Sequence, residues 1–232
     1  MMPQRHTYRY ITVLAISLLA FLPGDAYGQF TKKKKEKPEV VDTVPLFRGV
    51  AVSVDAVGLI QDATGDYGQY EGAVRVNLKD RYFPVIEVGY GKADKQNHNT
   101  EVHFKTKAPY GRIGCDFNIM KNKHDIYRVY AGGRYAFSSF KYDIEDITVI
   151  DPIWGEEAAY GGKDQKCTYQ WVEALMGIDA KIWGPLRLGW SIRYRSCVSK
   201  KHGDMGKPWY VPGYGKLGET PLGATFNITL EL

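Results

Sequence analysis

One stretch of the chain matches a motif for nucleotide binding. The segment GYGKLG, Gly213 to Gly218, fits the G-x-G-x-x-G spacing with which a glycine-rich turn approaches a pyrophosphate. That chemistry needs a strand before the motif and a helix N-terminus after it, whereas here Pro221 opens a strand pattern. We therefore interpret these glycines as a flexible loop and predict no bound cofactor.

Histidines form a second group of candidates, this time for acid–base chemistry. Beyond the N-terminal region they are His98, His103, His124 and His202. A lipid hydrolase or acyltransferase would set His103 or His202 beside Ser199 or Glu101. Neither a nucleophile elbow nor a metal-ligand spacing accompanies them. The sequence therefore predicts loop histidines, no catalytic or metal-binding residues, and a protein that is not an enzyme.

Acidic residues gather in one long segment. They are Asp143, Glu145, Asp146, Asp151, Glu156, Glu157 and Asp164. Carboxylates of this kind suit Ca²⁺, but the D-x-D-x-D-G spacing of a calcium loop is absent. We predict a solvated external loop. Its first part, KYDIEDITVI, alternates like a strand, so a protruding ribbon with an edge open to a partner strand is the alternative.

The elements that must position these residues are strands. Eight segments alternate apolar and polar residues with a period of two, namely residues 49–58, 69–78, 85–91, 111–119, 126–138, 171–182, 184–196 and 222–232. Short links near KDRY, KNKHD and WGP alternate with long ones along the chain. Short and long links therefore lie at opposite ends of an up-and-down meander, as in outer-membrane barrels.

The polar faces of these strands are rich in charge. They carry Asp55, Glu71, Glu87, Asp116, Glu173 and Asp179 with Arg75, Arg112, Arg128, Arg134, Lys181, Arg187, Arg193 and Arg195. Arginine predominates over lysine, which favours buried pairs because the guanidinium fork holds a carboxylate in two hydrogen bonds. We predict that these rows face inward, and that Glu87→Ala or Arg193→Ala impairs folding.

The apolar rows would then face outward. Toward the strand ends they carry the aromatic residues Tyr70, Tyr90, Tyr127, Tyr135, Phe137 and Tyr194, as the interfacial girdles of a membrane barrel do. A soluble lipocalin-like barrel would reverse the two faces and enclose a ligand among the apolar residues. Eight strands leave no room for a wide pore.

The N-terminus predicts export. Arg5 and Arg9 precede an uncharged run, Ile11–Leu22, that is too short to span a bilayer as a helix. We assign residues 1–28 to a signal peptide, 29–46 to a Lys-rich periplasmic tether and 47–232 to the barrel. Of the net charge of +5, +1 lies in the signal and +3 in residues 29–40, which leaves +1 beyond. This small remainder gives no reason to expect nucleic acid as a partner.

Three cysteines leave at least one thiol unpaired within the chain. Cys167 and Cys197 should lie near the external ends of adjacent strands. A turn near Gly184 opposes residues whose numbers sum to about 368, and this pair sums to 364, an offset of roughly 13 Å. A disulfide between them would need a bulge, because its Cα atoms must lie within about 7 Å.

From about Phe47 to Leu232, this patterning resembles the small eight-stranded outer-membrane β-barrels of Gram-negative bacteria, with the OmpA/OmpX-type architecture, and more loosely an uncharacterised family of outer-membrane barrels. The resemblance implies an all-β, antiparallel, up-and-down transmembrane barrel with short periplasmic turns and long external loops. Such families typically end in an aromatic residue, whereas this chain ends in Leu232.

A non-enzymatic outer-membrane protein follows from this resemblance, with a structural or binding role through its external loops. Its implied surroundings and partners are outer-membrane lipids and lipopolysaccharide, the barrel-assembly machinery during insertion, and an unknown external partner, and the protein would be a monomer. Two alternatives stay open: a soluble periplasmic lipocalin-like ligand-binding barrel, and an outer-membrane lipid-modifying enzyme.

Overall fold

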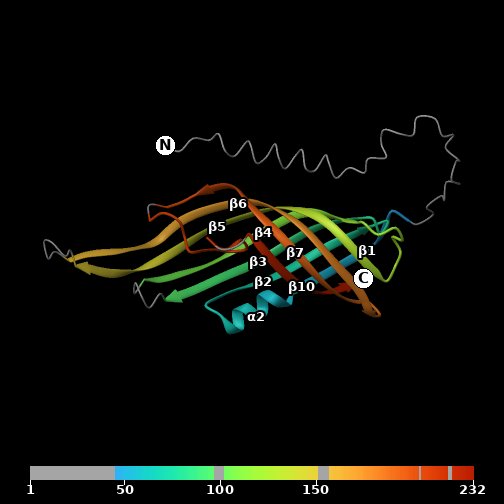
Figure 1. Cartoon of the computed structure of the whole chain (residues 1–232), viewed down its shortest axis with the longest axis horizontal. Helices are drawn as coiled ribbons and strands as arrows, with labels where there is room; N and C mark the ends of the chain where they lie inside the picture. The colour runs from blue at the N-terminus through green and yellow to red at the C-terminus, as the bar shows by residue number, and fades with distance from the viewer. Residues whose placement is uncertain (1–44, 97–101, 151–156, 204, 219–220) are drawn as a thin grey trace, which may run out of the picture. The chain divides into compact units, whose positions relative to one another are not determined.

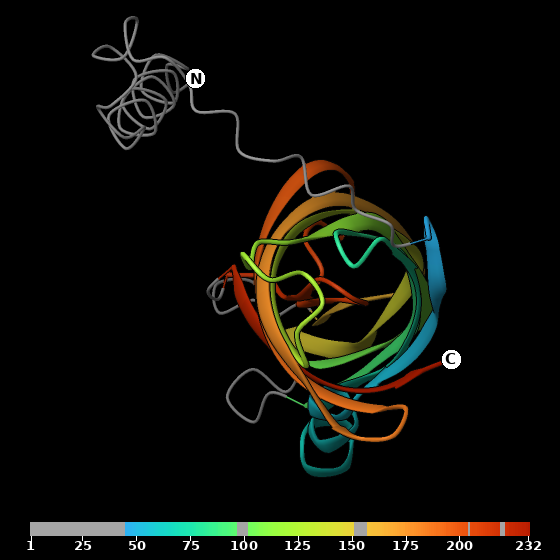
Figure 2. The ribbon, with the colours of Figure 1, turned by 90° about the vertical axis from the view of Figure 1, so that its right-hand side faces the viewer.

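Eight long antiparallel strands close into a barrel (Figures 1 and 2). The computed structural model describes residues 45–96, 102–150, 157–203, 205–218 and 221–232, without the side chains of 146–150 and 157–160. The wall runs β1-β10-β7-β6-β5-β4-β3-β2. The predicted all-β, eight-stranded antiparallel barrel is therefore confirmed, while the predicted signal peptide and most of the tether lie outside the described residues.

The strands of the wall differ greatly in length. They are β1 (Phe47–Asp55), β2 (Tyr67–Leu78), β3 (Tyr82–Gln96), β4 (His103–Asn118), β5 (Tyr127–Ile150), β6 (Glu157–Trp183), β7 (Leu186–Lys201) and β10 (Leu222–Glu231). β5 and β6 extend well beyond the other strands, and their pairing continues to Ile150 opposite Glu157 (Figure 1). The prediction of a solvated external loop is therefore wrong for KYDIEDITVI, and the alternative, a protruding ribbon, is confirmed.

The observed strand ends differ from the predicted ones in two places. The first predicted strand runs too far, because Asp55 ends β1 and caps the helix α2 (Ala56–Thr64) by accepting hydrogen bonds from the amides of Val57 and Gly58. Much of the segment predicted as a long link after β3 belongs to β3 and β4. Among the described residues, no helix is long and apolar enough to cross a membrane.

The connections at one end of the barrel are short, as predicted. Lys79 and Asp80 adopt positive φ angles of 56° and 54° in the tight turn between β2 and β3. Gly184, with a φ of 51°, turns between β6 and β7. Glu173 then lies opposite Arg195 and Trp171 opposite Cys197, which confirms the register expected for this hairpin.

The two faces of the wall are chemically opposite. Charged side chains of the alternating rows are buried in the lumen, and Val, Ile, Met and aromatic side chains of the other rows are exposed outside. Val88 and Ile192, for example, are each 63% exposed, whereas Glu87 and Arg193 are 2% and 3% exposed. The inward assignment of the polar rows is confirmed. Lys181 is exposed, but it lies opposite the buried Arg187 in the sheet and lines the cavity at the short-turn end of the lumen.

Candidate functional site

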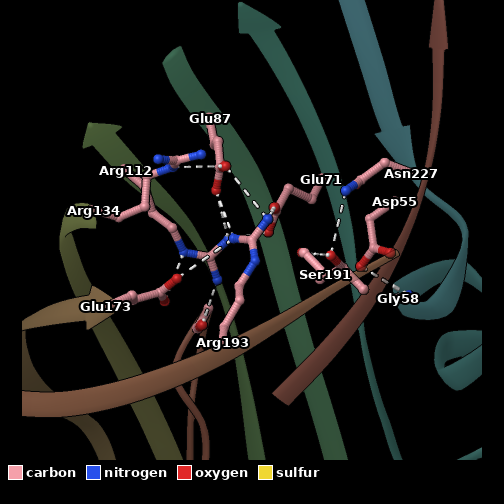
Figure 3. Close-up of polar contacts among 12 residues, drawn as sticks. Asp55, Gly58, Glu71, Glu87, Arg112, Arg134, Glu173, Ser191, Arg193 and Asn227 are labelled. Carbon is pink, nitrogen blue, oxygen red and sulfur yellow. Dashed lines mark hydrogen bonds and ion pairs between the residues drawn. The ribbon is translucent and has the colours of Figure 1, made fainter. Parts of the chain in front are cut away.

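The centre of the lumen is filled by carboxylates and guanidinium groups. Glu87 on β3 accepts from three arginines of three other strands: Arg193 at 2.7 Å, Arg134 at 3.0 Å and Arg112 at 3.2 Å. Figure 3 shows these side chains converging from around the barrel. Because each strand contributes alternate residues to the lumen, charges far apart in the sequence meet at one level.

Glu71 and Glu173 complete this central cluster. Glu71 accepts from Arg112 and, at 2.7 Å, from the hydroxyl of Tyr110. Glu173 lies 3.1 Å from Arg112 Nε and accepts from the indole of Trp171 at 2.7 Å. A buried charge is tolerated only when it is paired and hydrogen-bonded, and this cluster meets that condition for its carboxylates.

A second layer of charge continues toward the short turns. Asp116 lies 2.7 Å from Arg134 and 3.1 Å from Arg75, and Asp179 lies 2.5 Å from Arg187. The guanidinium of Arg75 also stacks over a tyrosine ring, at 5.0 Å from the Tyr130 centroid. The charges therefore form a connected column rather than isolated pairs.

The short-turn end closes with another polar group. Asp80 contacts His124 Nδ1 at 2.6 Å and Asn77 Nδ2 at 2.6 Å, and Arg128 binds Glu231 at 2.7 Å. Burial opposes ionisation of Asp80, but the hydrogen bonds from His124 and Asn77 outweigh it and lower the pKa of this carboxyl. A cavity of about 310 Å³ lies beside these residues.

The outer half of the lumen is filled by aromatic side chains, which the sequence analysis did not predict. Its buried side chains are Phe104, Phe140, Tyr142, Tyr169, Trp171 and Tyr210, together with Ala93, Ala108, Ala136, Cys167 and Val211. Trp171 and Ala136 are fully buried. The signal was present in the sequence, because Phe104, Thr106 and Ala108 alternate with Lys105 and Lys107. The predicted inward-facing charged rows therefore describe the interior only as far as the central charge cluster, and above it the interior is aromatic.

A small hairpin plugs this outer half. Its strands are β8 (Tyr210–Val211) and β9 (Gly215–Lys216), and Val211 and Pro212 at its tip are fully buried. Figure 2, which looks along the barrel, shows this orange-red part of the chain inside the ring of strands. The plug hairpin contains most of GYGKLG, so the prediction of a flexible loop is wrong for this segment.

Arginines of the wall hold the plug hairpin in place. Arg112 donates to the carbonyl of Gly213 at 2.7 Å, and Arg195 donates to the carbonyl of Tyr214. Gly213 has a φ of +81°, and a Cβ there would lie 2.5 Å from the ring of Tyr110. The glycine of the supposed nucleotide motif therefore serves a tight turn packed against the wall.

The described lumen is closed at its centre. The void among the central charges measures about 10 Å³, which is the space of roughly one water molecule. Larger cavities of about 170 Å³ and 530 Å³ occur on two sides of the plug hairpin. Within the described lumen, cavities large enough for a small ligand therefore lie toward the ends of the barrel and not at its centre.

The candidate histidines do not converge. His103 lies 2.5 Å from Asp94 and 2.9 Å from Glu145, which raise its pKa, Asp94 having the larger effect. His202 contacts the Tyr169 hydroxyl at 3.2 Å, and burial followed by the nearby lysine charges lowers its pKa. His124 lies at the opposite end beside Asp80. His98 and Glu101 lie outside the described residues.

The described acidic residues pair locally. Asp164 lies 2.7 Å from Lys141 and its amide donates to Asp143 at 2.6 Å, while Glu145 contacts His103. Asp151, Glu156 and the side chains of Asp146 and Glu157 lie outside the described residues. Within the described part of the chain, no group of three potential ligands could hold a metal ion.

All three cysteines are free. Cys167 is buried opposite Phe140, and Cys197 is exposed opposite Trp171, four residues away along β6. The bulge between Gln170 and Trp171 leaves this separation in place, so the proposed disulfide between Cys167 and Cys197 is not formed.

Comparison with known proteins identifies one family. Residues 8–232 match a family model described as "Domain of unknown function (DUF6048)". No curated protein and no solved structure matches the chain.

Proposed function

We propose that this chain, which belongs to the DUF6048 family, is an integral outer-membrane β-barrel protein without enzymatic activity. Its role on this proposal is to present a rigid, plugged mouth for binding. The observation that carries the proposal is that the two faces of the barrel wall are reversed relative to those of a soluble barrel. Charged side chains fill the lumen, while apolar side chains cover the outside of the wall.

The apolar exterior is continuous around the barrel. Its exposed members include Val74, Ile86, Val88, Ile113, Met176, Ile178, Trp190, Ile192 and Ile228, contributed by six of the eight strands. Soluble monomers rarely expose apolar patches beyond a few hundred Å², so a surface of this kind needs a nonpolar environment. A lipid bilayer supplies one on every side of a cylinder at once.

The height of this apolar band suits an outer membrane. On β5 it runs from Tyr127 to Phe137, ten residue steps or roughly 34 Å along a strand, which a tilt of about 45° reduces to roughly 24 Å. Tyr82, Tyr90, Tyr135 and Tyr194 are exposed toward its edges. Above it, exposed lysines replace apolar residues, with Lys92 opposite Lys107 and Lys141 opposite Lys166. Cations at this level suit anionic headgroups.

The two alternative functions require features that differ from these. A soluble lipocalin-like barrel needs its apolar rows inside around a ligand cavity, and the central lumen is charged with a void of only about 10 Å³. A lipid-modifying enzyme needs a nucleophile, a base and an orienting group in contact. The described histidines lie apart, each with its own partners.

Cell fractionation followed by electrophoresis tests the proposal. We expect the protein in the outer-membrane fraction, and the detergent extract should give different mobilities unheated and boiled, because barrels survive cold detergent. Recovery in the soluble periplasmic fraction, or identical mobilities with and without boiling, would refute membrane insertion. A changed lipid A pattern in expressing cells, absent from cells with an empty vector, would instead support the enzymatic alternative.

A further inference from the structure

Arg195 differs from the other arginines of the lumen. Arg75, Arg112, Arg128, Arg134, Arg187 and Arg193 each have a carboxylate oxygen within 3.1 Å. For Arg195 the nearest is Glu173 Oε1, at 3.9 Å from its Nε. Glu173 is engaged more closely by Arg112 and by the indole of Trp171. Arg195 is therefore the lumen cation without a close carboxylate partner among the described residues.

The fold nevertheless fixes this guanidinium in position. Its Nη1 donates to the carbonyl of Tyr214 in the plug hairpin. A Cβ added to Gly223 of β10 would lie 2.1 Å from Nη2, and one added to Gly215 would lie 3.1 Å from Nη1. The buried Nε has no hydrogen-bond partner in the described structure. Two glycines thus make room for a cation that has no carboxylate oxygen closer than 3.9 Å among the described residues.

The cavity of about 170 Å³ opens beside Arg195. Its lining residues include Gln61 and Gln69, Tyr67 and Tyr210, and Lys216. The ammonium of Lys216 lies 4.6 Å from the centroid of the Tyr67 ring. The lining is thus cationic, aromatic and amide-bearing at once.

One carboxylate, Asp55, contributes to the described lining, and both of its oxygens accept hydrogen bonds from backbone amides. Its Oδ1 accepts from the amides of Val57 and Phe226, and its Oδ2 accepts from the amide of Gly58. These bonds cap α2 and tie it to β10, so Asp55 is oriented toward backbone amides. No ion pair joins Asp55 to Arg195 among the described residues, so this guanidinium remains available to an anion in the cavity.

We propose that this cavity binds a small organic anion whose carboxylate or phosphate group pairs with Arg195. The planar guanidinium matches both groups through two parallel hydrogen bonds. The side-chain amides of Gln61 and Gln69 suit hydroxyl groups on the rest of the ligand. The volume lies below the 300–1,000 Å³ of a drug-sized pocket, so a ligand about the size of one sugar acid or sugar phosphate fits. This site is independent of membrane insertion.

Calorimetric titration of the folded, detergent-solubilised full chain tests the proposal. The probes are glucuronate and glucose 6-phosphate, with neutral glucose as the matched control. We expect saturable binding of at least one anion, with glucose at least about tenfold weaker, since a charge-assisted pair contributes 1.5–3 kcal/mol.

Variants locate the site. Arg195→Lys keeps the charge but loses the planar fork, and Gly223→Ala keeps Arg195 but places a methyl group against its guanidinium. Each should weaken anion binding at least about tenfold. Lys207→Gln removes a cation that lines the other cavity at the mouth, and it should leave the affinity within about twofold. Gln61→Leu, on α2, should weaken binding without touching the lumen charges.

Two results would overturn the proposal. One is the absence of saturable binding by either anion in the millimolar range. The other is equal weakening by Lys207→Gln and Arg195→Lys, because this would indicate diffuse attraction to the mouth. Heat-dependent mobility of each variant establishes folding separately, and the Gln61→Leu result decides the matter if an Arg195 variant does not fold.

Discussion

Glu87→Gln should destabilise the barrel by about 3–5 kcal/mol, the range for breaking a buried ion pair from one side. The substitution keeps the size of the side chain and removes its charge. Glu87 lies within 3.2 Å of Arg112, Arg134 and Arg193, and only 2% of it is exposed. Bulk water therefore does not reach that position to solvate the three guanidinium groups.

The loss should not reach three times that value. Each arginine keeps another carboxylate: Arg112 keeps Glu173 at 3.1 Å, Arg134 keeps Asp116 at 2.7 Å, and Arg193 keeps Glu173 at 3.5 Å. The variant therefore leaves one uncompensated positive charge spread over three groups. A second substitution, Arg193→Met, removes that excess charge, and the double variant should recover at least about half of the lost stability.

Denaturant unfolding in detergent micelles, followed by the mobility of unheated samples, measures these differences. Asp66→Asn is a matched control, because Asp66 and its partner Lys95 are both exposed and water screens such a pair. A loss of stability below about 1 kcal/mol for Glu87→Gln would refute the claim that Glu87 balances the charge of three buried arginines. Further destabilisation on adding Arg193→Met would refute it as well.

Other predictions follow from single residues. Met176→Lys on the outer face should lower the free energy of unfolding by about 2–4 kcal/mol if that face meets lipid, and by less than about 0.5 kcal/mol if it meets water. Unfolding of the variant in lipid vesicles and in nonionic detergent measures the change. In NMR titrations the pKa of His103 should lie above its ordinary value and fall in Asp94→Asn; its contribution to stability is then present below about pH 6.5 and is lost as pH rises through the folded-state pKa. Thiol reagents should label Cys197 in the folded protein and Cys167 only after unfolding, as mass spectrometry of timed samples would record.

The rows of the lower barrel could be predicted because the pleat of a strand separates odd from even residues. Glu173 and Asp179 on β6 face inward, whereas Met176 and Ile178 face outward. The inward position of Leu175 weakens the polar row without changing its direction, since Leu175 is buried with the charges around the central void. Register followed from the short turn at Gly184, which leaves the hairpin little freedom.

The upper barrel was missed because the same period carries the opposite chemistry there. Phe104, Thr106 and Ala108 face inward, and Lys105 and Lys107 face outward. When a strand is predicted from an apolar row on its outer face, the change from apolar residues to lysines looks like the end of the strand. The plug hairpin was missed for a different reason: its position depends on Arg112 and on other contacts distant in sequence, and no local pattern encodes them.

The polarity change divides the barrel into two levels with different tasks. Below, charges from many strands pair with one another and leave space for about one water, which favours a rigid wall at this level. Above, the wall outgrows the apolar band and is filled by aromatic rings and the plug hairpin. Arg112 joins the levels, because one guanidinium binds Glu71 below and the carbonyl of Gly213 above. A mouth anchored in this way stays preorganised when empty, which lowers the entropy cost of binding. Anything that the protein recognises should therefore meet a fixed surface at the mouth rather than a loop that orders on contact.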